Sequence, residues 1–402
     1  MRLRWTACAL VLLGILAVTV PVEAQGLNEV LTGLLSNNCA ALGKRTFGPE
    51  LALICGAFSS GCTGGVCADQ APGGGGAGSA ASAGGTGGAA SRGGESQILR
   101  RLRQRQAAAS ADDGDARGLS LFGSTDYQKF DKDTTPFESG FQRDTTGGTV
   151  GADYLLHNGL VLGGALSYAH EFGNYEGVGG GFDHDAYGIL LYGSVVPFSG
   201  TFVDVVAGYT RKDYRFDRRA SLSIPATTFT VSGAASGETA GNEFRLGVNL
   251  GHDFLLGRFS IGPRAGVLYR ETTMDGFRES GRTGLELAYD NQNMQSLITT
   301  VGLYGSVVLN TGFGVIVPQA TVEYVHEFLD DQRNVGFSFV QDPGDARFLF
   351  ETDPPDRDYF NLGVGVAMVL PNGLQPFLNY VELLGYQDRR SHAVTLGLRV
   401  PF

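Results

Sequence analysis

The chain has 402 residues, a formal net charge of -11 and 61 glycines, about twice the average share of glycine. This glycine content excludes an ordinary helical protein, and its irregular spacing excludes a collagen-like repeat, but a β protein rich in tight turns remains compatible with it. The acidic balance, which the short arginine cluster at 100–105 does not change, argues against nucleic acid as a partner.

Residues 1–24 have the features of a cleaved signal peptide. The segment has a basic start, an apolar centre from Ala7 to Val20 and a small-residue ending at Ala24. We therefore expect an exported protein, whose mature form keeps Cys39, Cys55, Cys62 and Cys67. In an oxidising periplasm we expect two disulfides among these four, with three pairings open, because their spacing does not fit a zinc site.

Three short regions follow the signal peptide. Residues 25–71 form a small head with apolar residues at helical spacing, too small to fold without disulfides. Residues 72–94 are a Gly-rich linker. Residues 95–111 predict one helix, with Ser96 as the N-cap and a stop at the Asp-Asp-Gly run that follows. This helix is too polar and too short to be stable alone.

From about residue 116 to residue 402, segments of alternating hydrophobicity are separated by turns of two kinds. The short turns lie at 157–159, 198–200, 256–258, 310–312 and 371–373. The longer connections lie near 130–140, 173–182, 217–240, 273–292, 330–356 and 387–391. Short turns on one rim and long loops on the other are typical of an outer-membrane barrel.

The predicted fold class is all-β: a twelve-stranded antiparallel transmembrane β-barrel with an N-terminal pore helix. No apolar run of about 18 residues follows the signal peptide, so a membrane-spanning helix is not expected. A closed barrel is the other fold that satisfies its backbone in lipid. A soluble sandwich, which alternation alone also allows, is the alternative.

The alternation predicts which side chains face lipid and which face the lumen. Along 242–251, the apolar Phe244, Leu246 and Val248 alternate with polar residues, and charge on the lipid face would cost roughly 2–4 kcal/mol at the midplane. The charged residues that we expect in the lumen are Asp153, Asp204, Glu243, Arg245, Arg264, Arg270, Glu323, Glu327 and Arg399.

The chain ends on one more alternating strand, 392–402. Its apolar face consists of Val394, Leu396, Leu398, Val400 and Phe402. We expect this strand to pair with the first strand and close the barrel, and its end to be recognised as the signal for assembly.

Three runs, 147–172, 274–306 and 318–328, together with the final Phe402, resemble the autotransporter β-domain over about 116–402. The resemblance implies a monomeric barrel in the outer membrane of a Gram-negative bacterium, with a helix through its pore and a passenger upstream. Its partners would be outer-membrane lipid, the outer-membrane assembly machinery and periplasmic chaperones, with no nucleic acid and no cofactor. Family passengers usually have hundreds of residues, whereas only residues 25–115 precede the barrel here.

Pore size can be compared with the predicted helix. Twelve strands tilted about 40° give a backbone diameter of roughly 24 Å, which leaves about 10–12 Å for one helix. Its cationic residues, Arg100, Arg101, Arg103 and Arg105, would then meet lumen carboxylates among Asp153, Asp204, Glu243, Glu323 and Glu327. The alternative is a solvated helix in the periplasm.

Two motifs contain residue types that occur in catalytic sites. Segments 168–172 and 324–328 repeat one pattern, but Glu171 and Glu327 should lie on opposite walls, beyond the roughly 5–9.5 Å that carboxylate pairs need. Aromatic anchoring at the membrane interface is the favoured interpretation. The Asp183-His184-Asp185 run is interpreted as a solvated loop edge, and the sequence has no G-x-S-x-G or H-E-x-x-H motif. No enzymatic activity is expected.

These observations predict an autotransporter-type barrel whose helix fills the pore. Its short disulfide-bonded head is either translocated and displayed outside or retained as a periplasmic appendage. The alternative is a surface adhesin that uses the long loops, especially 217–240 and 330–356. An outer-membrane hydrolase dependent on His184 or Glu327 is a third hypothesis. The sequence leaves open on which side of the membrane residues 25–71 lie.

Overall fold

The computed structural model describes residues 118–402, except 136, 157–158, 178, 224–229, 330, 343, 345–346 and 372, together with Leu51 and Ile54. The linker 72–94, the predicted helix 95–111 and all the cysteines lie outside the described residues. The pore helix and the disulfides therefore stay predictions. In the part of the chain that the structure describes, no helix is long and apolar enough to cross a membrane.

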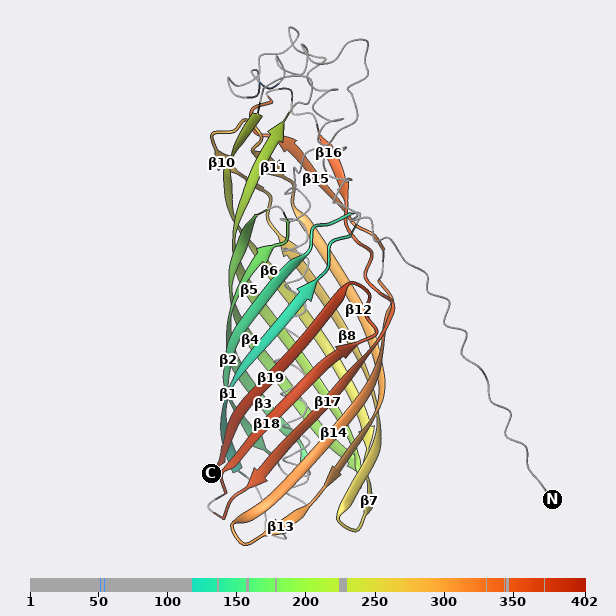
Figure 1. Cartoon of the computed structure of the whole chain (residues 1–402). Coiled ribbons are helices and arrows are strands. Elements are labelled where there is room, and N and C mark those ends of the chain that lie inside the picture. The colour runs from blue at the N-terminus through green and yellow to red at the C-terminus, as the bar shows by residue number, and fades with distance from the viewer. Residues whose placement is uncertain are drawn as a thin grey trace, which may run out of the picture.

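Twelve antiparallel strands form a closed barrel (Figure 1). In chain order they are β1 (Gly118–Lys132), β2 (Phe141–Leu155), β3 (Val161–Tyr175), β4 (Gly180–Phe198), β5 (Thr201–Ser223), β6 (Thr230–His252), β8 (Phe259–Met274), β12 (Gln292–Val307), β14 (Gly314–Glu327), β17 (Asp358–Val369), β18 (Gln375–Leu384) and β19 (Arg389–Pro401). Each pairs with the barrel strands before and after it, and β19 pairs with β1. The predicted twelve-stranded barrel and its closure by the last strand are confirmed, and the sandwich alternative is wrong.

The C-terminus lies at the rim that carries the short turns (Figure 1). The backbone N–H of Phe402 donates to the carbonyl of Leu119 at 2.8 Å, so both ends of the barrel sequence meet there. All five predicted short turns join strands at this rim, two of them flanked by the short strands β7 (Phe254–Leu256) and β13 (Leu309–Thr311). Four turn glycines adopt positive φ, namely Gly159 (74°), Gly200 (78°), Gly257 (65°) and Gly373 (81°).

The opposite rim is more ordered than the sequence predicts. The prediction of a long polar loop at 217–240 is wrong, because β5 and β6 continue as a paired hairpin up to Ser223 and Thr230. Within this hairpin the buried Phe216 and Arg218 alternate with the exposed Asp217. The side chains of this segment alternate between two faces, as in any strand, but many of them are charged, so the sequence resembled a loop.

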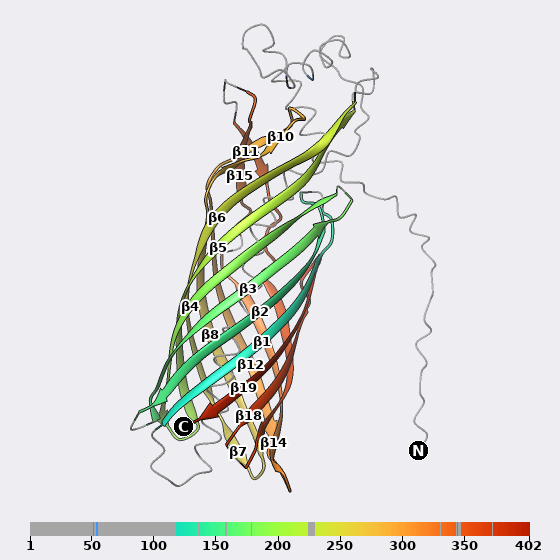
Figure 2. The same cartoon turned by 90° about the vertical axis from the view of Figure 1, so that its left-hand side faces the viewer.

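Two other long connections also contain strands. These are β9 (Phe277–Arg278), β10 (Ser280–Gly281), β11 (Leu287–Tyr289), β15 (Asn334–Phe339) and β16 (Phe348–Glu351). Strand β10 pairs with β6, and the other four form a separate sheet in the order β16-β15-β11-β9. We call this four-stranded sheet the cap, and Figure 2 shows part of it, with β10, beyond the barrel rim.

Exposure along the barrel strands is inverted relative to a soluble protein. Leu191 and Leu246 are 63% and 44% exposed, whereas Asp204 and Glu243 are 0% exposed. An apolar outer surface over a charged interior is the partition that lipid imposes on a barrel.

Glycines inside the barrel make room for aromatic rings on neighbouring strands. A Cβ atom at Gly163 would lie 2.3 Å from Cζ of Tyr192, and one at Gly397 would lie 2.2 Å from Cζ of Phe377. Gly151, Gly173 and Gly251 have the same relation to Phe122, Phe182 and Phe202. Part of the high glycine content therefore reflects interior packing as well as turns.

Candidate functional site

Charged side chains of the barrel interior pair with one another across neighbouring strands. Lys212 Nζ lies 2.7 Å from Glu243 Oε2, and both side chains are buried. Arg399 Nη2 lies 3.6 Å from Asp153 Oδ1, again with both side chains buried. Charges removed from water need such partners, so these pairs offset the cost of burial.

Glu171 is the centre of a third buried group. Arg143 Nη1 donates to Glu171 Oε1 at 3.4 Å, and His184 Nδ1 lies 3.1 Å from the same oxygen. All three side chains are almost completely buried. The carboxylate is thus held by a cation and an imidazole of the barrel wall.

The Asp183-His184-Asp185 run lies within β4, so its interpretation as a loop edge is wrong. Strand alternation turns His184 inward and leaves the two aspartates on the outer face, beside His170. Ligand atoms of His170, Asp183 and Asp185 lie within 4.8 Å of one another, as in a metal site. Arg215 Nη1, however, lies 3.1 Å from Asp183 Oδ1, so the carboxylates already have a cation.

Eight of the nine residues expected in the lumen are buried, and Glu323 is partly buried. Arg264 contacts Asp253, and Arg245 Nη2 donates to Thr210 Oγ1 at 3.1 Å. Arg270 Nη2 lies 3.5 Å from Ser296 Oγ.

Not all lumen carboxylates are neutralised by the barrel. Glu327 accepts hydrogen bonds from Ser296 Oγ at 2.6 Å and from the backbone of Leu297 at 2.8 Å. Neither Glu323 nor Glu327 forms an ion pair with any cationic side chain that the structure describes. Among the described residues, two of the carboxylates expected to meet the predicted pore helix therefore have no cationic partner, whereas Glu243 and Asp153 have one.

The repeated motifs lie on β3 and β14, which are six positions apart in the ring of twelve strands. The prediction that they occupy opposite walls is confirmed. Tyr168 OH donates to Asp185 Oδ1 at 2.7 Å, and Tyr324 OH donates to Asp358, both on the outer surface. Glu171 and Glu327 consequently do not form an acid-base pair.

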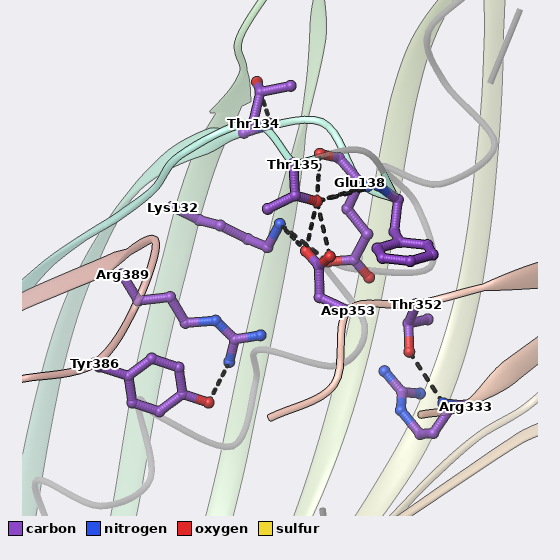
Figure 3. Close-up of polar contacts among 11 residues, drawn as sticks. Lys132, Thr134, Thr135, Glu138, Arg333, Thr352, Asp353, Tyr386 and Arg389 are labelled. Atoms are coloured by element: carbon purple, nitrogen blue, oxygen red, sulfur yellow. Dashed lines mark hydrogen bonds and ion pairs between the residues drawn. The ribbon is translucent and has the colours of Figure 1, made fainter. Parts of the chain in front are cut away.

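A cavity of about 430 Å³, lined by apolar, polar and charged side chains, opens at the outer mouth of the barrel. On one side, Lys132 Nζ lies 2.6 Å from Asp353 Oδ2 and 3.1 Å from Glu138 Oε2, and Thr135 Oγ1 donates to Asp353 at 2.7 Å (Figure 3). Burial raises the pKa of Glu138, and the Lys132 ammonium opposes that shift. The sequence did not reveal this cluster, because Lys132 and Asp353 are 221 residues apart.

Two arginines line another part of this cavity (Figure 3). Arg389 Nη1 donates to Tyr386 OH at 3.0 Å, and its guanidinium lies 4.9 Å from the centre of that ring. Arg333 is fixed through its backbone, which bonds to Thr352 in both directions. Burial lowers the pKa of Arg333, an effect that the Glu138 carboxylate opposes. The cavity therefore presents charged groups of both signs.

The cap is joined to the barrel through the β5–β6 hairpin. Ring centroids of Phe216 and Phe277 are 5.4 Å apart, and those of Phe277 and Tyr289 are 4.8 Å apart. Beside them, Arg218 Nε donates to Glu279 Oε1 at 2.9 Å. Aromatic stacking and a buried ion pair thus fix the cap on this side.

The cap also contacts the head. Leu51 and Ile54 are helical, and neither has exposed surface. The backbone N–H of Leu51 donates to Gln341 Oε1 at 3.2 Å. Gln341 lies two residues beyond the end of β15, so this contact joins the head to the cap.

Comparison with known proteins gives consistent results. A family model described as autotransporter beta-domain matches residues 121–381. Lipase 1 of Photorhabdus luminescens is 21% identical over 63% of this chain and 38% of its own length. Outer membrane protein A of Rickettsia conorii is 28% identical over 57% of this chain and 11% of its own length. The chain therefore spans well under half the length of these relatives.

Among solved structures, the translocator domain of the autotransporter NalP from Neisseria meningitidis has a similar fold. The two superpose with a TM-score of 0.57 at 15% identity, covering 77% of this chain and 98% of that domain.

Proposed function

Because this chain belongs to the autotransporter β-domain family, which places its barrel in the outer membrane of a Gram-negative bacterium, we propose that the barrel translocates the chain's own N-terminal segment to the cell surface. Residues 25–71 are the passenger in this proposal, and the barrel itself has no catalytic step.

The observation that carries the proposal is the contact of Leu51 with Gln341. The barrel sequence starts at Gly118 at the short-turn rim, which is the periplasmic side of such barrels. Leu51 lies beside the cap at the opposite, extracellular rim. This arrangement supports a crossing of the membrane by the chain between these two residues.

Passage through the lumen is the favourable route for this crossing. The barrel wall is closed by continuous strand pairing, and a route through lipid would leave backbone polar groups without partners. The predicted helix 95–111 would then occupy the lumen with its arginines near Glu323 and Glu327, the carboxylates without a barrel cation.

Insertion would depend on the outer-membrane assembly machinery and on periplasmic chaperones. On β19, Val394, Leu396 and Leu398 are 38%, 55% and 42% exposed on the outer face, and Phe402 follows them. An exposed apolar strand end of this kind is accessible to recognition before the barrel closes against β1.

Protease accessibility on intact cells tests the proposal. One epitope tag is placed after Gln25, and a second is placed in the β5–β6 connection at 224–229 to report barrel orientation. Loss of both tags supports translocation. Loss of the second tag alone, with the first removed only after permeabilisation, would place the head in the periplasm and refute it.

A further inference from the structure

We propose that the cap is a docking surface for the chain's own head, so that the translocated segment around Leu51 and Ile54 stays bound at the outer mouth of the barrel. This inference rests on the proposed translocation, because only a head that has crossed the membrane can reach the cap. It goes further by assigning a permanent binding partner to the head and to the outer loops.

On the head side, the contact is a backbone hydrogen bond that lies next to two buried apolar side chains. Residues three apart in a helix lie on the same face, so Leu51 and Ile54 are buried together. The Leu51 amide finds its acceptor in a side chain 290 residues away.

The cap side holds its acceptor on a fixed backbone. The N–H of Val340 donates to the carbonyl of Glu286 at 2.9 Å, and the N–H of Asp342 donates to the carbonyl of Phe339 at 3.0 Å. Gln341 therefore stands in a turn anchored on both sides, and its amide oxygen is in place to receive the helix.

The cap also presents apolar side chains that a small sheet cannot bury by itself. Val335, Phe337 and Phe339 share one face of β15, beside Leu287 of β11, and each is at most 2% exposed. Strands of two to six residues form a sheet too small to be stable alone. The β5–β6 hairpin packs against its β9 edge through Phe277, and the head contacts the turn that follows β15.

Docking predicts that the head stays on the cell after the chain is cut. A site for a sequence-specific protease is inserted into the linker at residue 72 of the full chain, with an epitope tag after Gln25. All cysteines precede residue 68, so no disulfide can hold a severed head to the barrel. After cleavage on intact cells, the wild-type head should remain with the cell pellet.

Variants at the contact should release the head. Leu51→Asp with Ile54→Asp, and separately Gln341→Ala, should raise the amount of severed head in the medium at least tenfold. Leu349→Asp is the matched control on the same hairpin, because Leu349 is 62% exposed and should leave retention unchanged. Heat-dependent gel mobility of the barrel verifies that each variant has folded.

The possible failures are distinguishable. Release of the wild-type head on cleavage would overturn docking and leave translocation intact. Cleavage only after permeabilisation would overturn both proposals. A photo-crosslinking residue at position 341, read by mass spectrometry of the uncut chain, should give a cross-link to a peptide that contains Leu51 or Ile54. Without that cross-link, docking is overturned whatever the protease result.

Discussion

The buried ion pair between Arg218 and Glu279 should determine how firmly the cap is held. The two side chains are 5% and 2% exposed, and Arg218 Nη2 also donates to the carbonyl of Leu285 at 2.9 Å. Arg218→Ala leaves the Glu279 carboxylate buried, with the backbone N–H of Leu287 at 2.8 Å as its remaining donor. Removing one partner of a buried pair costs about 3–5 kcal/mol.

That cost predicts a large change in hydrogen exchange. At about 1.4 kcal/mol per tenfold, local opening of the cap should become about 10²- to 10⁴-fold more frequent in Arg218→Ala. The measurement is hydrogen-deuterium exchange of the amides of β9 and β11 in the membrane-inserted barrel. Arg215→Ala is the control on the same strand, because its ion pair with Asp183 is 59% and 33% exposed and should contribute below about 1 kcal/mol.

Two results would refute this reasoning. If Arg218→Ala accelerates exchange no more than Arg215→Ala does, the pair does not hold the cap. If Arg218→Met combined with Glu279→Leu leaves the cap as open as the single variant, the effect is not due to an unpaired buried charge. Replacement of both partners by apolar residues should restore most of the protection.

Three further predictions concern the interior, the cap and the pore. Gly163→Ala should destabilise the barrel by about 1–3 kcal/mol, because the added Cβ would displace Tyr192. Gly312→Ala is the control, because a Cβ at Gly312 would meet nothing within 4 Å. Unfolding in denaturant measures the stability of both variants. Burial acts to raise the pKa of Glu286, but hydrogen bonds from Thr283 and Gly284 hold it below its usual 4.5. The ionised Glu286 carboxylate therefore stabilises this loop of the cap above pH 4.5, and this stabilisation is lost as the pH falls through the lowered pKa. Hydrogen exchange of residues 282–287, corrected for intrinsic rates, should rise on acidification in the wild type. In Glu286→Gln it should already be raised at neutral pH. Replacing Arg100, Arg101, Arg103 and Arg105 by glutamate should raise single-channel conductance in planar bilayers, and unchanged conductance would contradict a helix in the pore.

The barrel could be predicted because lipid constrains each membrane-spanning residue separately. Phe244, Leu246 and Val248 face outward, as the alternation of 242–251 predicts, because a charge at any of these positions would meet hydrocarbon. The pairing of β1 with β19 was predicted from a second constraint: a sheet in lipid cannot leave an open edge, so the last strand must pair with the first.

Parts of the structure that lie outside the membrane could not be predicted in this way. In water, charged residues are allowed on both faces of a hairpin, so the segment around Arg218 resembled a loop. The cluster of Lys132 with Asp353, and the bond of Leu51 to Gln341, join residues far apart in the chain, which no periodicity indicates. The split of Asp183, His184 and Asp185 between two faces follows from alternation once β4 is known to extend through them.

Translocation and docking place opposite demands on the outer rim, which must let the chain pass and then bind it. Two attachments of the cap, one to the barrel and one to the head, differ in a way that meets both demands. The link through Arg218 and Glu279 joins residues of the barrel domain, so it can form before the head arrives. The link through Gln341 needs Leu51, so it can form only after the head has crossed. We therefore expect Arg218→Ala to loosen the cap whether or not the head is present, whereas Gln341→Ala should do so only in the full chain, and exchange measured with and without residues 25–71 separates the two.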